Sequence, residues 1–219
     1  SLTYVKICYA GARSTADIEH NGLTLNGVGN GTKIENIYVL ESADDAIEFF
    51  GGTVNVTNLL AVNPDDDMFD FTQGYCGTLK NCYGVWESGY TSTEADPRGI
   101  EADGNLDGDY SDHLRQSDFT VENMTIVNNA ANTTDNVDRM QDVIKIRRGA
   151  KATITNALVK GSGGTIDLID MNDSKGAGNA ASSISITHTL NFKNKLNGTL
   201  NTFTEPTTNT GADASLFTW

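Results

Sequence analysis

The sequence has few prolines and few basic residues. Of its 219 residues, 3 are proline, and 15 lysines and arginines face 29 aspartates and glutamates, for a net charge of −14. Binding to phosphate groups needs a basic surface, so we expect no nucleic-acid partner. Cations, or surfaces bridged by cations, suit this charge better. No apolar run reaches the roughly 18 residues of a membrane-spanning helix, so no membrane span is predicted.

No signal peptide is visible either, and the chain opens at Ser1 without methionine. Glycine, asparagine, threonine and aspartate are abundant, which is typical of an exported β-protein with many corners. We therefore expect a mature or trimmed piece of an exported protein, located outside the cell or on its surface. Its length predicts one domain with a sizeable core.

Cysteine is scarce, with an odd count of three. One interpretation pairs Cys76 with Cys82 across a turn and leaves Cys8 free. In the other, Cys82 faces inward as a small apolar residue, because it occupies the position held by Ile37 and Leu59 in earlier repeats.

Residues 33–86 carry one pattern twice and begin it a third time. The first copy reads KIENIYV and then DDAIEFFG, and the second reads NVTNLLA and then DDMFDF. Apolar residues alternate with polar ones over short segments that are rich in Val, Ile, Phe and Tyr, which predicts strands. Gly, Asn, Asp and Thr separate the segments and predict turns.

Asparagine recurs at one place in this frame. The five positions are Asn36, Asn58, Asn81, Asn123 and Asn156, with Tyr4 at the equivalent place upstream. The first spacings are 22 and 23 residues (36 to 58, 58 to 81), and the next is 42, which fits one coil plus an insertion. A period of roughly 22 residues predicts a solenoid, in which asparagine tolerates a left-handed backbone and its amides bond from coil to coil.

A leucine-rich repeat lacks support, because there is neither a leucine-rich consensus nor a helix in each repeat. Several strands per coil, polar corners and loops of free length predict an all-β, right-handed parallel β-helix. We expect this helix over residues 1–192 and an irregular C-terminal tail or cap over 193–219, anchored by Phe203, Leu216, Phe217 and Trp219.

These motifs resemble the pectate-lyase-like β-helix superfamily. More narrowly, the motifs EFFGG, DDDxϕD, RGIExD and IRRG resemble a group of secreted bacterial β-helix proteins of unassigned activity. The resemblance covers about residues 3–190 and implies the fold and export from a bacterial cell.

Aligning the second strand of each coil predicts two columns of polar side chains. One reads Thr24, Glu48, Asp70, Glu101, Lys145 and Asp167, and the other, three residues earlier, reads Asn21, Asp45, Asp67, Arg98 and Asp142. Strands stack about 4.8 Å apart, so neighbouring carboxylates repel by about 3 kcal/mol at an effective dielectric near 20. We therefore expect a calcium ion between Asp45, Glu48, Asp67 and Asp70, or a retained proton.

A second calcium candidate is the stretch after residue 102. Asp103, Asn105, Asp107 and Asp109 follow the alternating spacing of a calcium loop, although its twelfth position is Leu114 rather than glutamate. The alternative is an acidic solvated loop.

Two functions remain open. The first is an extracellular structural, adhesive or glycan-binding module that calcium stabilises, with possible partners in an acidic polysaccharide, a cell-surface component, or further copies through an open β-helix end. Trp86 and Tyr90 are candidates for stacking on sugar rings, or else pack a loop onto the coil.

The second function is a calcium-dependent lyase on a uronate polymer, which the superfamily resemblance implies. Lys145 or Arg147 is then the candidate base, with Glu101 beside them. A glycoside hydrolase of this superfamily is disfavoured, because no histidine stands between two glycines.

Overall fold

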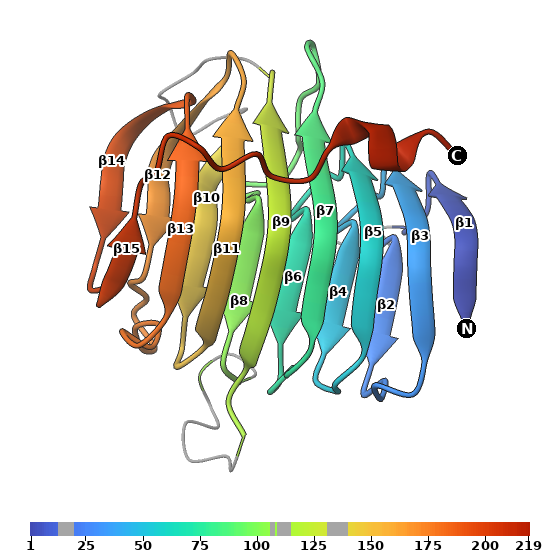
Figure 1. Ribbon diagram of the computed structural model, residues 1–219, viewed down its shortest axis with the longest axis horizontal. Helices are drawn as coiled ribbons and strands as arrows, with labels where there is room; N and C mark the ends of the chain where they lie inside the picture. The colour runs from blue at the N-terminus through green and yellow to red at the C-terminus, as the bar shows by residue number, and fades with distance from the viewer. Residues whose placement is uncertain (13–19, 106–107, 109–114, 131–139) are drawn as a thin grey trace.

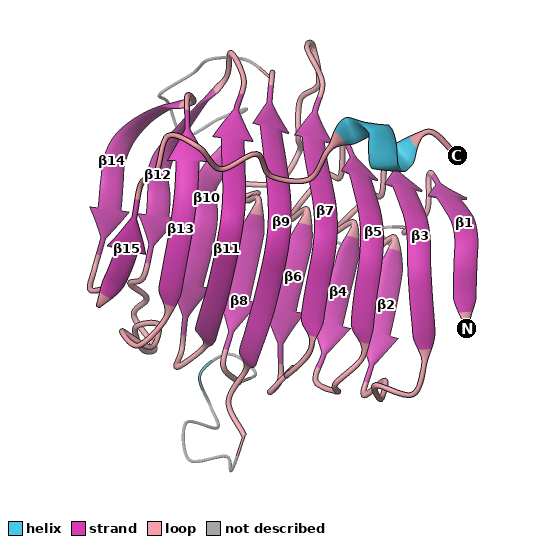
Figure 2. Ribbon diagram, viewed as in Figure 1, coloured by secondary structure: helices cyan, strands magenta, loops and turns pink. Residues whose placement is uncertain are grey.

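The computed structural model describes residues 1–12, 20–105, 108, 115–130 and 140–219. The described chain forms a right-handed parallel β-helix, in which successive strands alternate between two facing sheets (Figures 1 and 2). The predicted fold is therefore confirmed. No helix among the described residues has the length and apolar character needed to cross a membrane.

Within the described part of the chain, the larger sheet has eight parallel strands and the smaller has seven. The eight-stranded sheet contains β1 (Leu2–Cys8), β3 (Lys33–Leu40), β5 (Asn55–Val62), β7 (Thr78–Trp86), β9 (Asp118–Asn128), β11 (Lys151–Lys160), β13 (Ser183–His188) and β15 (Thr202–Thr204). The seven-stranded sheet contains β2 (Leu23–Asn26), β4 (Ile47–Phe50), β6 (Phe69–Thr72), β8 (Ile100–Asp103), β10 (Met140–Arg147), β12 (Gly164–Asp170) and β14 (Asn191–Asn197).

The recurring asparagines form a ladder along the eight-stranded sheet. All five have φ between 52° and 57°, the left-handed conformation that asparagine tolerates better than most residues. From Asn58 onward, each amide nitrogen donates to the amide oxygen of the preceding asparagine at 2.8–2.9 Å. Tyr4 has the same backbone conformation, with φ 56°, but cannot extend the amide ladder. The ladder holds the coils in register, and that register determines which side chains meet on the opposite sheet.

Apolar side chains fill the space between the sheets. Phe49, Phe71 and Phe119 stack from coil to coil, with ring centroids 5.2 Å and then 4.1 Å apart. Such pairs contribute about 0.5–1.5 kcal/mol beyond the burial of their area. Cys82 is fully buried in register with Leu59 and Met124, and all three cysteines are free. The proposed Cys76–Cys82 disulfide is therefore wrong, and the interpretation of Cys82 as a small core residue agrees with the structure.

The helix continues beyond the boundary drawn from the sequence. Residue 192 lies within β14, which pairs with β12, and β15 pairs with β13. The irregular tail therefore begins after Thr204. The boundary was drawn too early because β14 and β15 are polar and largely exposed, so they lack the apolar alternation that identifies the earlier coils.

The tail crosses the outer face of the eight-stranded sheet toward β1 (Figure 1). The backbone nitrogen of Thr210 donates to Asn156 Oδ1 at 2.8 Å, and Thr125 Oγ1 donates to the carbonyl of Ala212 at 2.9 Å. A short 3-10 helix, η2 (Ala214–Phe217), follows, and the Trp219 ring then meets Tyr4 edge-on at 5.8 Å. The tail thus links the last coils to the first.

Candidate metal centre

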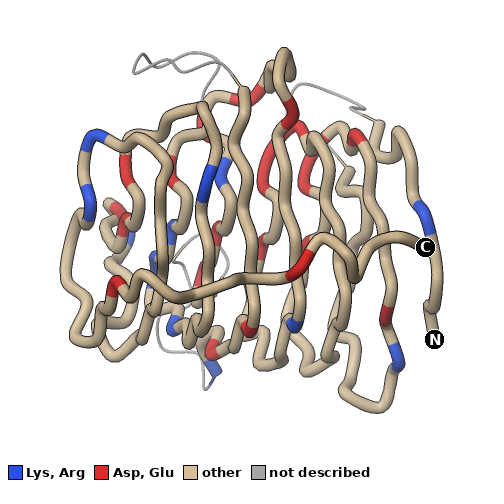
Figure 3. Tube along the Cα trace, turned by 45° about the horizontal axis from the view of Figure 1, so that its top comes forward, with Lys and Arg blue, Asp and Glu red and all other residues tan. Residues whose placement is uncertain are grey.

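The register of the seven-stranded sheet brings acids from successive coils side by side. Glu48 pairs with Asp70, Asp70 with Glu101, and Glu101 with Lys145. The acids that precede β4 and β6 lie three residues earlier in each coil, where Asp45 Oδ1 accepts the backbone N–H of Asp67 at 3.0 Å. Figure 3 shows acidic positions of neighbouring coils gathered in the upper middle of the molecule.

The end of the predicted column needs correction. Lys145 pairs with Asp170, whereas Asp167 pairs with Asp142 and belongs to the other column. The ladder asparagine lies 14 residues before the column residue in this coil (156 to 170), against 12 in the first two coils (36 to 48, 58 to 70). The connection between the two strands of this coil is therefore two residues longer, which shifts the alignment of its second strand by two positions.

The acids line a pocket of about 280 Å³ on this sheet, here called the acidic pocket. Its lining contains eight acidic residues and two arginines: Asp45, Glu48, Asp66, Asp67, Asp70, Asp96, Glu101 and Asp103, with Arg98 and Arg147. With every group ionised, the lining carries six net negative charges.

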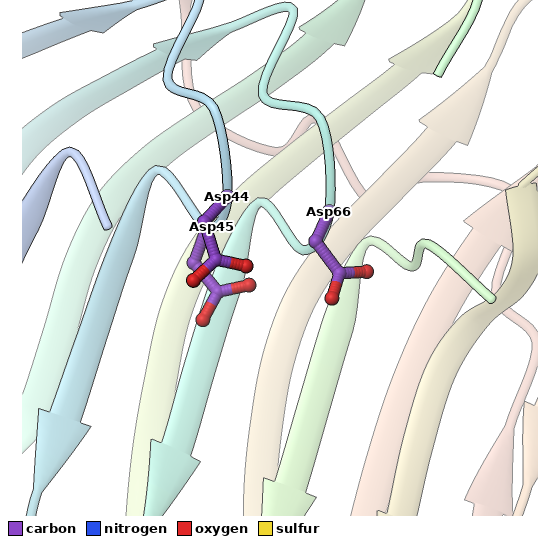
Figure 4. A group of neighbouring side chains, drawn as sticks. All are labelled: Asp44, Asp45 and Asp66. Carbon is purple, nitrogen blue, oxygen red and sulfur yellow. The ribbon is translucent and has the colours of Figure 1, made fainter. Parts of the chain in front are cut away.

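Two acidic triads lie beside each other in this region. Asp45, Glu48 and Asp70 each offer one carboxylate oxygen, and these oxygens lie within 4.8 Å of one another. Asp44, Asp45 and Asp66 form a second triad within the same limit, so Asp45 belongs to both. Figure 4 shows the second triad, in which residues from the turns before β4 and β6 hold their carboxylates side by side.

Several carboxylate oxygens in the pocket have neither solvent nor a partner among the described residues. They are Asp66 Oδ1, Asp67 Oδ1 and Asp70 Oδ1, and Asn21 Oδ1 next to them is in the same state. A buried acceptor without a partner costs about 1–3 kcal/mol, and more when charged. These oxygens therefore favour a ligand that supplies positive charge.

Burial raises the pKa of these acids. The pKa of Glu48 rises to about 7, chiefly through desolvation, although hydrogen bonds with Asn21 and Asp70 oppose the rise. The pKa of Asp66 rises to about 8 through desolvation and the charge of Asp96. Desolvation raises the pKa of Asp70 well above its ordinary value, and the charge of Glu48 adds to the rise. Without a cation, Glu48 and Asp70 therefore share a proton.

The basic groups are already paired with acids on the β8 side of the pocket. Arg98 binds Glu101, Asp96 at 2.7 Å and Asp142 at 3.3 Å. Burial alone would lower the pKa of Arg98, but the charges of Asp67, Asp96 and Asp142 raise it, so Arg98 stays protonated. Uncompensated negative charge therefore remains on the β4 and β6 side.

Arg147 occupies the same end of the pocket. Its guanidinium contacts Glu101 and donates to Asp103 Oδ1 at 2.8 Å. Burial, together with the charges of Arg98 and Arg148, lowers the pKa of Arg147. Lys145 differs, because it forms a buried ion pair with Asp170 and does not line the pocket.

A family model described as a pectate-lyase-like β-helix domain matches residues 1–218. The chain belongs to the pectate-lyase-like β-helix family. No curated protein and no solved structure matches the chain. The fold of the family is thus shown for almost the whole length, and activity has to be argued from the pocket.

The pocket of this pectate-lyase-like domain fits a hard divalent cation. Its candidate ligands are all oxygens, which calcium prefers, and calcium accepts six to eight of them in flexible geometry. Asp67 and Asp70 each have a buried oxygen without a hydrogen-bond partner, which is available to contact such an ion. Asp45, Glu48 and Asp70 are the residues that would hold the ion.

In the predicted calcium loop, the two described candidate ligands already have protein partners. Arg147 and Arg148 both donate to Asp103, and Asn105 is buried and donates to Gln116 Oε1 at 3.1 Å. Asp103 is therefore a counter-ion of two arginines. Asp107 and Asp109 lie outside the described residues.

Trp86 and Tyr90, the candidates for stacking on sugar rings, pack against each other and against the loop at Pro64. Trp86 is 1% exposed and donates from Nε1 to the carbonyl of Pro64 at 3.0 Å. Tyr90 donates to the same carbonyl at 2.9 Å, and its ring lies 5.5 Å from Trp86. Sugar stacking on Trp86 is therefore wrong, because both its ring faces are inside the protein.

Sequence reasoning missed Asp44 and Asp66 as candidate ligands. The signal was available, since each precedes a predicted ligand in the pairs Asp44-Asp45 and Asp66-Asp67.

Proposed function

We propose that the chain is an extracellular β-helix module that binds calcium in the acidic pocket and, through that calcium, an acidic polysaccharide. The observation that supports this most is the triad of Asp45, Glu48 and Asp70 beside buried oxygens without partners. Calcium in the pocket replaces the protons that these acids otherwise retain. Weak extracellular calcium modules bind at about 10⁻⁴–10⁻³ M, which suits a partly open, acid-rich pocket.

The arginine end of the pocket supports an acidic sugar polymer as the partner. A uronate carboxylate can approach bound calcium on the β4 and β6 side and Arg147 on the β8 side. Guanidinium groups bind carboxylates with directional, charge-assisted hydrogen bonds. Neutral glycans lack this group and are expected to bind less well.

Thermal unfolding with calcium, with magnesium and with a chelator tests the calcium step. Calcium raises the melting temperature of the wild type, magnesium raises it less, and Glu48→Gln and Asp70→Asn remove the calcium effect. Glu122→Gln is the matched control, because Glu122 is a partly exposed acid on the opposite sheet, paired with Lys80 at 3.5 Å. A melting temperature that calcium leaves unchanged contradicts the proposal.

Retardation in gels that contain polygalacturonate or alginate tests the partner. We expect retardation that requires calcium and is weakened in Glu48→Gln but kept in Glu122→Gln. Equal mobility in acidic and neutral polysaccharide gels, with calcium present, argues against acidic-glycan binding.

A second candidate function is lyase cleavage of a uronate polymer, and the lowered pKa of Arg147 favours it. An arginine accepts a proton only in its neutral guanidine form, and a lowered pKa makes that form more accessible. Arg147 lines the same pocket as the acid triad. Calcium would supply neutralisation of the uronate carboxylate. Lys145 is a poorer base than the sequence suggested, because Asp170 holds its ammonium group.

Ultraviolet absorbance of the unsaturated product, measured on uronate polymers with added calcium, tests this activity. A lyase gives rising absorbance that chelator and Arg147→Ala both abolish. If the absorbance rises on none of the polymers, the lyase activity is rejected and calcium-dependent binding is the remaining proposed function.

A further inference from the structure

Lys145 and Asp170 hold an amine and a carboxyl group in contact away from water. They are register partners on β10 and β12, and Lys145 Nζ donates to Asp170 Oδ2. Lys145 is 8% exposed and Asp170 is 7% exposed. The other carboxylate oxygen, Asp170 Oδ1, accepts the backbone N–H of Asn172 at 2.9 Å. The carboxyl group is thus fixed with one oxygen on the lysine and the other on a backbone donor.

A third buried acid, Asp142, lies beside this pair. Asp142, Asp167 and Asp170 each place one carboxylate oxygen within 4.8 Å of the others. Asp142 is 1% exposed, and its Oδ1 has neither solvent nor a hydrogen-bond partner among the described residues. Burial raises the pKa of Asp142 to about 6, although the charges of Arg98 and Lys145 oppose the rise. Asp142 therefore holds a proton closer to neutral pH than an ordinary aspartate does, as suits a group that transfers protons.

Burial and proximity both favour a reaction between the two partners. Removing an ammonium and a carboxylate from water costs desolvation free energy, whereas the amide that they form together carries no charge. Holding two reactive groups in contact also replaces a bimolecular step by an intramolecular one. Well-oriented groups of this kind react as though present at about 10⁵–10⁸ M.

We propose that Lys145 and Asp170 condense into an amide bond that joins β10 to β12, with the Asp142 carboxyl group carrying the protons between them. The ion pair is the reactant. Nζ forms a bond to Cγ of Asp170, and the bond from Cγ to Oδ2 breaks. The two protons that Nζ loses pass through Asp142 to Oδ2, which leaves as water. One ammonium and one carboxylate thus give one amide and one water, with no further reactant.

The surroundings of the pair suit this reaction. When Nζ adds to Cγ, negative charge develops on Asp170 Oδ1, where the backbone N–H of Asn172 already donates. The bond would close a loop between positions 25 residues apart and tie adjacent coils together. Lys145, Asp170 and Asp142 are not lining residues of the acidic pocket, so the proposal does not rest on calcium binding.

Mass spectrometry of the intact chain and of its tryptic peptides tests the bond. The wild type is expected to be lighter than its sequence by one water. Trypsin should not cut after Lys145, and the peptides that contain Lys145 and Asp170 should stay joined. A wild type with the full mass of its sequence overturns the proposal. A water loss confined to the Asp-Gly steps at 103–104 or 107–108, where succinimide formation also releases water, overturns it too.

Two variants separate the amine from the proton carrier. Lys145→Arg keeps the positive charge but lacks the amine, so it should have the full mass of its sequence. Asp142→Asn keeps both partners but cannot transfer protons, and it should also have its full mass while circular dichroism shows a folded β-protein. A folded Asp142→Asn variant that loses water as completely as the wild type overturns the role of Asp142.

The wild type contains a matched control in Lys151 and Asp118. These residues are also register partners on adjacent strands, and their side chains pair at 3.1 Å. Their side chains are 36% and 54% exposed, so water solvates both charges. Trypsin should therefore cut after Lys151 in the same digest that leaves the bond after Lys145 intact. Cleavage after both lysines overturns the proposal.

Discussion

Glu48 of β4 and Asp70 of β6 are register partners on adjacent coils, and each places a carboxylate oxygen within 4.8 Å of one from the other. Two carboxylates in this position cannot both be ionised at low cost, so one proton or one cation must lie between them. Desolvation raises the pKa of both groups, and the value of about 7 for Glu48 places its exchange of a proton for calcium near neutral pH.

The first prediction concerns pH. Folded-state pKa values of about 7 for Glu48 and about 8 for Asp66 lie above the unfolded values, so the native state binds more protons. Their contribution to stability without calcium is complete below the unfolded pKa values and is lost as pH rises through 7 to 8. Chemical denaturation in chelator should therefore show decreasing stability over this range, and Glu48→Gln should flatten the decrease. Increasing stability over the same range contradicts the assigned protonation.

The asparagine ladder gives the second prediction. Asn58→Ala removes two amide hydrogen bonds, each contributing about 0.5–1.5 kcal/mol, and adds a left-handed backbone penalty of roughly 1–2 kcal/mol. Asn58→Gly removes the same bonds without the backbone penalty. Unfolding in urea should show losses in both variants, with the larger loss in alanine. Stability kept in the glycine variant would assign the role of Asn58 to its backbone conformation alone.

The buried pair of Lys145 and Asp170 gives the third prediction. Lys145→Met leaves the Asp170 carboxylate buried without its ammonium partner, which costs about 3–5 kcal/mol. The double variant Lys145→Met with Asp170→Leu removes both charges and should recover much of that loss. A single variant as stable as the wild type, measured by urea unfolding, would show that water or another base replaces Lys145.

The first strand gives the fourth prediction. Among the described residues β1 pairs with β3 alone, so its other edge offers unpaired backbone groups beside Tyr4, which is 65% exposed. Sedimentation velocity should show concentration-dependent association of the wild type and of Thr3→Lys. Val5→Lys places a charge at the end of the core and should prevent it. A wild type that stays monomeric at high concentration rejects end-to-end association.

The fold and the position of the acid column could be predicted because both follow from the regular spacing of the coils. Asn36, Asn58 and Asn81 are nearly one coil apart, and this spacing places Glu48 beside Asp70. The alignment failed at β12, where the connection from the preceding strand is two residues longer. Asp167 was therefore placed beside Lys145, although the structure pairs Lys145 with Asp170.

The partners of the basic residues could not be predicted in the same way. Arg98 meets Asp142, which lies 44 residues later, and long side chains choose partners by their direction in space. The burial of Trp86 depended on a loop carbonyl at Pro64 that no local pattern identifies.

Calorimetric titration with Ca²⁺ near pH 7, repeated in buffers of different ionisation enthalpy, tests the central claim most directly. If Glu48 and Asp70 exchange a shared proton for calcium, the wild type shows saturable binding with proton release, and Asp70→Asn loses binding. Absence of saturable heat, or binding that Asp70→Asn leaves unchanged and that releases no proton, would contradict the account.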